Sequence, residues 1–256
     1  MSGSAEAVFA PVVEVDDLVA YYGNQRVLDG VSLSVQQGEI MVIMGGSGSG
    51  KSTLLRYLLG LQRPDSGTIR MFGKDIAALN ASEWRALRRK MGVSFQGGAL
   101  FSSMTVGDNV CLPLREHTHL DEKTIRIMSR MKLEVVNLAG FEHLMPAQLS
   151  GGMLKRAALA RAIVMDPSVL FFDEPSAGLD PISSRRLDEL ILELRDSLGA
   201  TIVVVTHELA SIFTIANNSV FLDAETRTMT TTGDPKVLRT ESPDPKVRAF
   251  LNRGEA

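Results

Sequence analysis

The amino-acid sequence predicts an α/β fold with a mainly parallel sheet, and three observations support that class. Short and almost wholly apolar runs recur along the chain, as expected of strands buried on both faces; examples are residues 40–44, 169–172 and 201–205. Helix-spaced apolar residues alternate with such runs in the second half of the chain. A glycine-rich segment directly follows residues 40–44, which is the place of a phosphate-binding loop in an α/β protein.

Eight segments have the composition of strands: residues 12–22, 31–35, 40–44, 68–72, 91–95, 169–172, 201–205 and 220–223. A helix is expected over residues 53–61, and the clearest one follows Asp180. Asp180 is a favourable N-cap, Pro181 suits the first helical position, and Gly199 suits the C-terminal end. Between these residues, apolar side chains recur at spacings of three and four: Leu187, Leu190, Ile191, Leu194 and Leu198.

The stretch between residues 95 and 169 shows no clear strand pattern and predicts two helices joined by loops. One covers residues 121–139, and the other begins after Ser150, which is itself a favourable N-cap. The first helix carries a stripe of helix-spaced apolar residues: Ile125, Met128, Met131 and Val135. The pattern indicates a helical subdomain inserted into the α/β domain.

Composition excludes several classes of protein. The chain has 256 residues and a formal net charge of −3, which argues against a broadly basic nucleic-acid surface. No apolar run approaches the roughly 20 residues that a membrane span needs, and residues 1–11 do not follow the pattern of a secretory signal. We therefore expect a cytoplasmic protein with one large domain. The single cysteine, Cys111, is expected to be a small buried residue.

Residues 45–52 match the phosphate-loop motif G-x-x-x-x-G-K-S between a predicted strand and a predicted helix. Glycines let backbone N–H groups turn toward an anion, and the helix N-terminus adds partial positive charge. Lys51 is expected to reach the β- and γ-phosphates, Ser52 to supply an oxygen to Mg²⁺, and Thr53 to contact the α-phosphate. The expected nucleotide-binding residues of this segment are Gly45, Gly46, Ser47, Gly48, Ser49, Gly50, Lys51, Ser52 and Thr53.

Two carboxylates follow the apolar run 169–172. Asp173, at the carboxyl end of a central strand, can orient water around Mg²⁺, and Glu174 beside it can polarise an attacking water. The strand is too apolar for these acids to belong to a solvated face. The alternative is that they only cap a helix, since Pro175 and Ser176 begin a turn.

Several motifs occur in the order typical of the ATP-binding cassette (ABC) family, which the sequence resembles over nearly its whole length. They are Tyr22 before a glycine, the loop at 45–52, Gln96 after a strand, Leu-Ser-Gly-Gly at 149–152, Asp173 with Glu174, residues 176–180, and His207 after the strand at 201–205. The resemblance implies an α/β P-loop NTPase fold of ABC type, with a mainly parallel core sheet, an antiparallel β subdomain and an inserted α-helical subdomain. It implies an ATPase domain at residues 12–240, with the helical subdomain at about 97–165, and a short appendage at 241–256.

In the family, two copies enclose two ATP molecules between phosphate loops and opposing Ser-Gly-Gly segments. The resemblance implies that Ser150, Gly151, Gly152 and Asp180 contact the ATP held by a second copy of the chain. Hydrolysis would need ATP and Mg²⁺. The implied catalytic set is Glu174 as base with His207, Lys51 and Gln96, and the implied metal set is Ser52, Gln96 and Asp173.

Tyr22 resembles the aromatic residue on which adenine stacks, because it directly precedes Gly23. Tyr21 beside it is an alternative, and a core aromatic at a strand end is another. His117, His119 and His143 form no convincing metal-ligand set.

A narrower resemblance points to ATPase subunits of the Mla type (maintenance of lipid asymmetry), whose transporters work with MCE-type lipid-binding proteins. It rests on residues 98–101, 108–110, 113–118, 144–146, 150–153 and 243–248. Met153 stands where the ABC family commonly has glutamine, and methionine is usual in the Mla type. The resemblance implies a peripheral subunit on the cytoplasmic face of the bacterial inner membrane that energises phospholipid transport. Implied partners are a second copy of the chain, an integral-membrane permease, an MCE-type protein and a small accessory subunit, with no nucleic acid.

Other assignments remain open. One alternative is an ABC ATPase that drives another cargo. A non-transport ABC ATPase is a second class, and a P-loop kinase is a third, although the kinase leaves residues 149–153 unexplained. A mostly apolar stretch behind Gln96 either docks a permease helix or belongs to the subdomain core. Its members are Ala99, Leu100, Phe101, Met104 and Val106.

Overall fold

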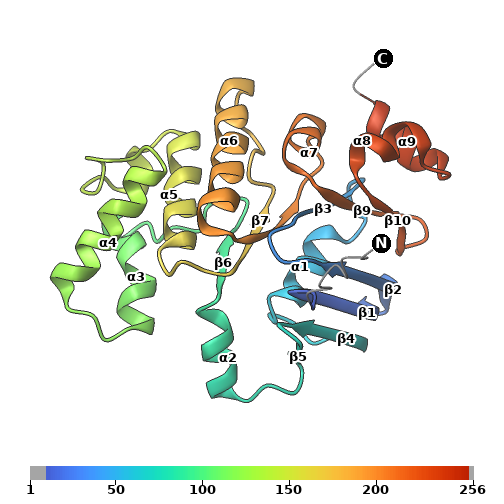
Figure 1. The fold of residues 1–256 in the computed structure, drawn as a ribbon, viewed down its shortest axis with the longest axis horizontal. Coiled ribbons are helices and arrows are strands. Elements are labelled where there is room, and N and C mark those ends of the chain that lie inside the picture. The colour runs from blue at the N-terminus through green and yellow to red at the C-terminus, as the bar shows by residue number, and fades with distance from the viewer. Residues whose placement is uncertain (1–9, 254–256) are drawn as a thin grey trace, which may run out of the picture.

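The computed structural model describes residues 10–253, which form two sheets with helices packed around them (Figure 1). The larger sheet has six strands in the order β10-β9-β3-β8-β7-β6. Strands from β9 to β6 run parallel, and β10 pairs antiparallel with β9. The six are β3 (Ile40–Gly45), β6 (Met91–Ser94), β7 (Val169–Asp173), β8 (Thr201–Val205), β9 (Asn218–Leu222) and β10 (Met229–Gly233).

The central strands β3 and β8 are buried at every residue, because both faces of the sheet are covered. Successive side chains therefore enter different cores: Val42 packs on one side of β3 and Ile43 on the other. The predicted parallel sheet is thus confirmed. Strand β10 was not predicted, because it is a half-exposed edge strand of mainly threonine with no apolar run.

A second sheet is antiparallel throughout and has the strand order β2-β1-β4-β5. Its strands are β1 (Val13–Tyr22), β2 (Gln25–Val35), β4 (Ser66–Met71) and β5 (Lys74–Asp75). Leu18 and Ile69 of this sheet share a core with Leu54 of α1 (Lys51–Leu58) and with Phe171 of β7. This sheet is the antiparallel β subdomain that the family resemblance implied.

Three α-helices and one 3-10 turn lie at the other end of the molecule, on the left of Figure 1. They are α3 (Val106–His117), α4 (Glu122–Val135), η1 (Pro146–Gln148) and α5 (Gly151–Ile163). The prediction of two helices was therefore wrong in number. Helix α3 lacks the expected pattern because Gly107 packs closely against Glu142 and Pro113 lies inside the helix.

The predicted apolar stripe of α4 is also only partly correct. Ile125 is buried as expected, but Met131 and Val135 are exposed. The buried face continues instead through Ser129 and Leu133, four residues apart each time.

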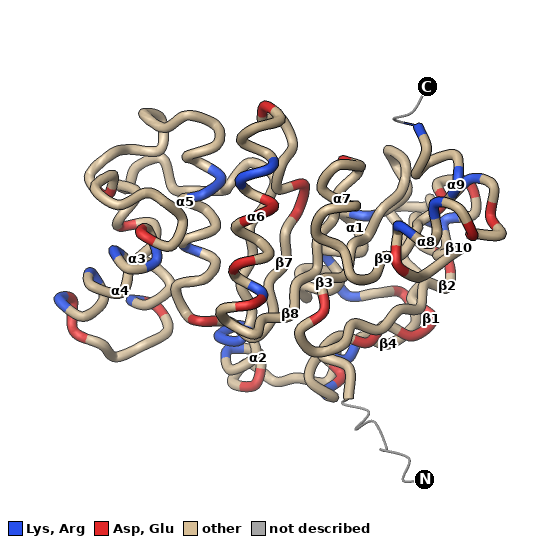
Figure 2. Tube along the Cα trace, turned by 45° about the horizontal axis from the view of Figure 1, so that its top comes forward, with Lys and Arg blue, Asp and Glu red and all other residues tan. Residues whose placement is uncertain are grey.

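Helix α6 (Pro181–Leu198) has the ends that the sequence predicts. The Asp180 carboxylate accepts hydrogen bonds from the backbone N–H groups of Ile182 and Ser183, each at 3.0 Å, and Gly199 ends the helix with φ 61°. Both acidic and basic residues lie along this helix (Figure 2). The shorter helices are α2 (Ala81–Arg88) and α7 (Leu209–Ile215).

The chain ends in helices α8 (Pro235–Glu241) and α9 (Pro245–Asn252), which pack on the same chain. The ring of Phe250 meets that of Phe221 in β9 edge to face, with 5.3 Å between centroids. The Lys246 ammonium pairs with the carboxylates of Asp223 and Glu225, each at 2.7 Å. Throughout residues 10–253, no helix combines the length and apolar character that crossing a bilayer requires.

Candidate functional site

The phosphate loop connects β3 to α1, as the sequence predicts. Gly45 has φ 150°, and a Cβ placed there would lie 2.4 Å from the Leu222 carbonyl oxygen. Gly50, the residue before α1, has φ 95° and equally little room, because a Cβ would come within 2.7 Å of Leu28. Only glycine suits such backbone conformations and close approaches. The loop is therefore shaped by these two glycines and leaves its N–H groups to an anion.

Lys51 lies at the start of α1 and is buried. Its ammonium donates hydrogen bonds to the carbonyl oxygens of Gly45, at 3.0 Å, and Gly46, at 2.8 Å. Burial lowers the pKa of Lys51, and the negative charges of Glu174 and Asp173 oppose that change. A phosphate chain on the loop would supply the negative charge that this ammonium needs.

Two carboxylates stand opposite the loop where β7 ends. The Oδ1 oxygen of Asp173 is buried and has no hydrogen-bond partner among the described residues. The carboxylate of Asp173 also interacts with the hydroxyl of Ser52 through a side-chain hydrogen bond. Burial is the main cause that raises the pKa of Asp173, followed by the nearby charge of Glu174. Oxygen ligands of this type fit Mg²⁺, which usually binds through one or two carboxylates, water and substrate phosphates.

Glu174 is buried and adopts φ 47°, a left-handed conformation that is uncommon outside glycine. Its Oε1 lies 2.7 Å from Nδ1 of His207, while Oε2 is buried without a partner in the described residues. The Glu174 N–H donates to the Val205 carbonyl oxygen at 2.8 Å, which ties the residue to the end of β8. A buried carboxylate with one free oxygen and a histidine on the other is arranged to accept a proton.

One cavity of about 590 Å³ collects most of the predicted residues. Gln96, two residues beyond β6, is exposed and lines this cavity together with the phosphate loop. Gly46 and Asp173 are neighbours in sequence of residues that line this cavity, but they do not line it themselves. The predicted residues on its wall are Gly45, Ser47, Gly48, Ser49, Gly50, Lys51, Ser52, Thr53, Gln96, Glu174 and His207.

Tyr22 lies outside this cavity, at the end of β1, with its side chain 75% exposed. Tyr21 is engaged within the chain, because its hydroxyl accepts a hydrogen bond from Nε of Arg26 at 2.9 Å. The Arg26 guanidinium also lies over the Tyr21 ring, 5.4 Å from its centroid. Of the two tyrosines, Tyr22 has the freer ring.

The residues expected to face a second copy are not on the wall of the cavity. Ser150 caps α5, and its hydroxyl accepts a hydrogen bond from the Met153 N–H at 3.3 Å. Gly151 begins the helix and is exposed, with Gly152 half-buried beside it. Asp180 caps α6 at an exposed position. Within one chain, the N-terminal end of α5 thus lies apart from the cavity at the phosphate loop.

The apolar stretch that follows Gln96 was predicted either to dock a permease helix or to belong to the subdomain core, and its residues differ in burial. Val106 is fully buried in the core, and Leu100 packs against that core. Phe101 is 52% exposed, and Ala99 is exposed as well. The stretch therefore anchors the loop at one end and presents apolar side chains at the other.

Two residues near the site were not predicted as site residues, because no local sequence motif includes them. Arg253, just after α9, lines the cavity and donates a hydrogen bond to the His207 carbonyl oxygen. Lys155, in the second turn of α5, donates to the Glu174 carbonyl oxygen at 3.1 Å. Both contacts join residues that are far apart in the chain, so only the folded structure reveals them.

Comparison with known protein sequences gives consistent matches. Residues 28–177 match the family described as ABC transporter. The chain is 44% identical over 247 residues to the intermembrane phospholipid transport system ATP-binding protein MlaF of Escherichia coli (strain K12), covering 96% of this chain and 91% of that protein. It is 41% identical to the probable ribonucleotide transport ATP-binding protein mkl of Mycobacterium leprae (strain TN), covering 98% of this chain and 72% of that protein.

Solved structures give the same result. A dimeric ATP-binding cassette in a post-hydrolysis state, bound to ADP and Pi, superposes with a TM-score of 0.79 and 29% identity, over 87% of this chain and 98% of that one. The cbiO1 protein from Clostridium perfringens, part of the ABC transporter complex cbiONQ, superposes with a TM-score of 0.81 and 30% identity, over 95% of each chain.

Proposed function

Because the chain belongs to the ABC transporter family of ATP-binding cassettes, we propose that it hydrolyses ATP to drive phospholipid transport between two bacterial membranes. The observation that carries the proposal is the buried Glu174 carboxylate, held by His207 across from the phosphate loop. The cargo follows from the 44% identity, over nearly the whole chain, to a protein named for intermembrane phospholipid transport.

We propose that the phosphate loop binds the phosphates of ATP through its backbone N–H groups, with Lys51 at the β- and γ-phosphates. Ser52, Gln96 and Asp173 would hold Mg²⁺, which neutralises charge on the phosphates when bound. The ring of Tyr22 would stack on adenine, since Tyr21 is occupied by Arg26.

Glu174 would then accept a proton from the attacking water through Oε2, the oxygen that is not engaged by His207. His207 holds the carboxylate from the other side at 2.7 Å, which fixes its direction. Glu174 is buried, which keeps its carboxylate out of bulk water, whereas the His207 side chain is 47% exposed. Gln96 completes the wall of the cavity and connects it to the helical subdomain.

We further propose that two copies of the chain form the working unit. Ser150, Gly151 and Gly152 at the start of α5 would bind the γ-phosphate of the partner's ATP, and Asp180 would lie beside them. This arrangement is supported by their separation from the cavity of their own chain and by the dimeric cassette among the similar structures. Each site would then need both subunits.

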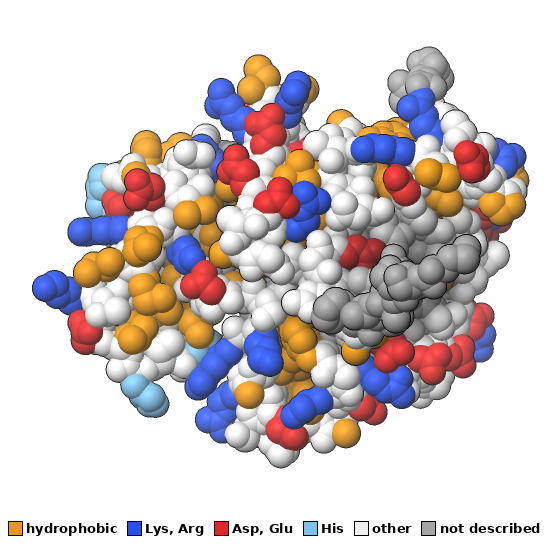
Figure 3. All heavy atoms as spheres, in the orientation of Figure 1, with side chains coloured by type: hydrophobic (Ala, Val, Ile, Leu, Met, Phe, Trp, Pro, Cys, Tyr) orange, Lys and Arg blue, Asp and Glu red, His pale blue; other side chains and the backbone are white. Residues whose placement is uncertain are grey.

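The proposed permease contact is the loop behind Gln96, where Phe101 is exposed. Apolar side chains also gather on the outer face of the helical subdomain (Figure 3), where Ile127, Met131 and Val135 of α4 are exposed. Such surfaces suit protein partners. From the resemblance to the Mla type, we also propose that the complex includes a permease, an MCE-type lipid-binding protein and a small accessory subunit, and that this chain lies at the cytoplasmic face of the inner membrane.

The proposed domain organisation is an ATPase domain at residues 12–240, with residues 97–165 as the helical subdomain and 241–256 as an appendage. Helix α9 of that appendage is packed against β9, as the contact between Phe250 and Phe221 illustrates.

Replacing Glu174 with glutamine tests the catalytic part of the proposal. We expect turnover to fall by about 100-fold or more, while the dissociation constant for ATP changes by less than about threefold, because only the proton acceptor is lost. The exposed Glu134 on α4 offers a matched control, and Glu134→Gln should keep wild-type turnover. Wild-type turnover in Glu174→Gln would show that another group is the base.

The cargo is tested in cells that depend on this chain. We expect Lys51→Ala to disturb the lipid asymmetry of the outer membrane, because hydrolysis no longer drives phospholipid transport. An intact lipid distribution together with altered ribonucleotide uptake would favour the cargo named for the Mycobacterium leprae relative.

A further inference from the structure

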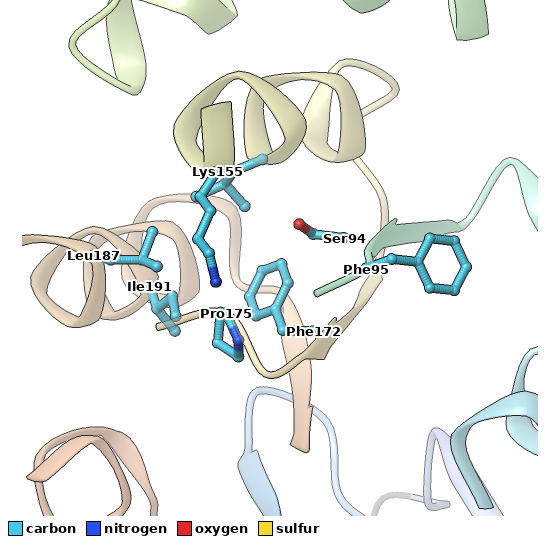
Figure 4. A pocket seen from close by; sticks show the side chains of 8 residues that line it. Ser94, Phe95, Lys155, Phe172, Pro175, Leu187 and Ile191 are labelled. Atoms are coloured by element: carbon cyan, nitrogen blue, oxygen red, sulfur yellow. The ribbon is translucent and has the colours of Figure 1, made fainter. Parts of the chain in front are cut away.

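Lys155 is half-buried, and its side chain points into the protein. It extends from α5 into a small, mainly apolar pocket beneath the helix, where Phe172, Pro175, Leu187 and Ile191 surround it (Figure 4). Its ammonium donates a hydrogen bond to the Glu174 carbonyl oxygen at 3.1 Å. Burial lowers the pKa of Lys155, and the charge of Glu174 opposes this change.

A lysine in such a place is unusual, because its ammonium is normally left in water. A methionine or leucine would fill the same apolar pocket without the cost of partly burying a charge. The hydrogen bond to Glu174 is the specific interaction that an apolar side chain does not provide.

The backbone that Lys155 contacts is itself held in an uncommon conformation. Glu174 has φ 47°, and residues with such angles persist only where the surroundings hold them. Three contacts do so here: the Glu174 N–H donates to Val205, and the Glu174 carbonyl oxygen accepts from the Ala177 N–H at 3.2 Å and from Lys155. Two of the three come from the neighbouring strand and turn, whereas the third comes from the helical subdomain.

Helix α5 connects the contact between Lys155 and Glu174 to the N-terminal end of the helix at Ser150, where the proposed function places the nucleotide of a second copy. It begins at Gly151, directly after the capping Ser150, and reaches Lys155 little more than one turn later. A helix of 13 residues that is buried along Ala157 to Ile163 moves as a stiff unit. A small displacement of its first turn therefore reaches the Glu174 backbone through the Lys155 side chain.

We propose that Lys155 is a positioning residue that couples the Ser150 end of α5 to the carboxylate of Glu174 in the same chain. The inference rests on the proposed function, in which the Ser150 end binds the nucleotide of a second copy. Binding of that nucleotide then sets the direction of Glu174, so the two ATP sites of the dimer depend on each other.

The test compares Lys155→Met, which fills the pocket but donates no hydrogen bond, with Lys155→Gln, which is neutral but retains a donor. We expect Lys155→Met to lower kcat by about tenfold or more, to leave the KM for ATP within about twofold, and to bring the Hill coefficient for ATP close to one. Lys155→Gln should recover a large part of both values. The exposed Lys123→Met on α4 is the control and should behave as wild type.

Thermal unfolding separates positioning from packing. Because methionine suits an apolar pocket, Lys155→Met should keep or raise the Tm while it loses turnover. Wild-type kcat and Hill coefficient in Lys155→Met would overturn the inference. So would a loss of turnover that parallels a fall in Tm and is not rescued by Lys155→Gln.

Glu174→Gln distinguishes failure of this inference from failure of the proposed function. If that variant loses turnover and still dimerises on ATP, the proposed base stands, and the Lys155 variants alone decide the coupling. Retained turnover in Glu174→Gln would overturn both. The double variant Glu174→Gln with Lys155→Met should still dimerise on ATP, since the coupling acts after the nucleotide is bound.

Discussion

At the scale of single residues, burial gives the carboxylates of this chain properties that surface acids do not have. Asp173 and Glu174 each keep one buried oxygen without a partner in the described residues, and both lie at the phosphate site. Asp188 has the same feature away from that site. It is buried in α6, its Oδ2 accepts a hydrogen bond from the Ser211 hydroxyl at 2.9 Å, and its Oδ1 has no partner in the described structure.

Asp188 should make folding stability depend on pH. Burial raises its pKa from 3.8 to about 6, with the nearby Glu189 adding to the shift and the hydrogen bond from Ser211 opposing it. Between these two values the folded state binds more protons than the unfolded state, so the free energy of unfolding falls as pH rises. The full loss is about 3 kcal/mol, since roughly two pKa units are involved.

Chemical denaturation between pH 4 and pH 7.5 measures this effect. We expect wild type to lose stability relative to Asp188→Asn over that range, and the difference to stop growing above about pH 7. Glu193→Gln, at an exposed position on the same helix, should follow wild type. Parallel pH profiles of wild type and Asp188→Asn would contradict the expectation.

At the scale of elements, two side chains hold the loop between Gln96 and α3. The Arg161 guanidinium of α5 donates to the carbonyl oxygens of Gly98 and Ala99, and the buried Asn109 holds the part from Phe101 onward. The Asn109 amide accepts a hydrogen bond from the Phe101 N–H at 2.7 Å and donates to the carbonyl oxygens of Phe101, Met104 and Thr105. Asn109 is fully buried in α3, so the loop conformation depends on the helix beneath it. The exposed Phe101, the proposed permease contact, is placed by this amide.

Asn109→Leu should therefore release the loop. Because it leaves buried backbone groups without partners, we expect it to lower the free energy of unfolding by about 2 to 4 kcal/mol. Co-purification with the permease should fall while the affinity for ATP stays near wild type, because the phosphate loop is not touched. Gln37→Leu, at an exposed turn, should change neither quantity. Normal co-purification by a folded Asn109→Leu protein would show that the loop is not the contact.

The elements differ in how far the sequence predicts them. Helix α6 was predicted with its ends, because its N-cap, proline and final glycine act locally. Helix α3 was missed, because Gly107 and Pro113 are unfavourable in a helix interior and are accepted only where packing compensates. Strand β10 was missed because pairing with β9, and not its own composition, makes it a strand.

At the scale of the whole molecule, the end of the chain returns to the nucleotide cavity. Arg253 lies just beyond α9 and stacks over the Phe250 ring, 4.3 Å from its centroid. Phe250 packs on Phe221 in the core sheet, and Arg253 donates a hydrogen bond to the His207 carbonyl oxygen. The appendage thus brings a positive charge to a site that is proposed to bind phosphates.

Removing that charge should weaken nucleotide binding. We expect Arg253→Ala to raise the dissociation constant for ATP by about threefold to tenfold, with little change in Tm, because the side chain is exposed. The effect should shrink at high salt. The control is Lys236→Ala on α8, which also removes one positive charge, but at an exposed position outside the cavity. This variant should bind ATP as wild type does. Equal affinities for the two variants would exclude a role for Arg253.

The sequence by itself determined the fold class, the phosphate loop, the acidic end of β7 and the capped helices α5 and α6. Each of these depends on residues that are adjacent or one helical turn apart, so a local pattern contains the information. The tertiary structure alone decided which distant segments meet. It brought Arg253 to the cavity and Lys155 to the backbone of Glu174, because such contacts arise only when separate strands and helices pack around a shared core, whereas the pairing of His207 with Glu174 was already implied by the family resemblance.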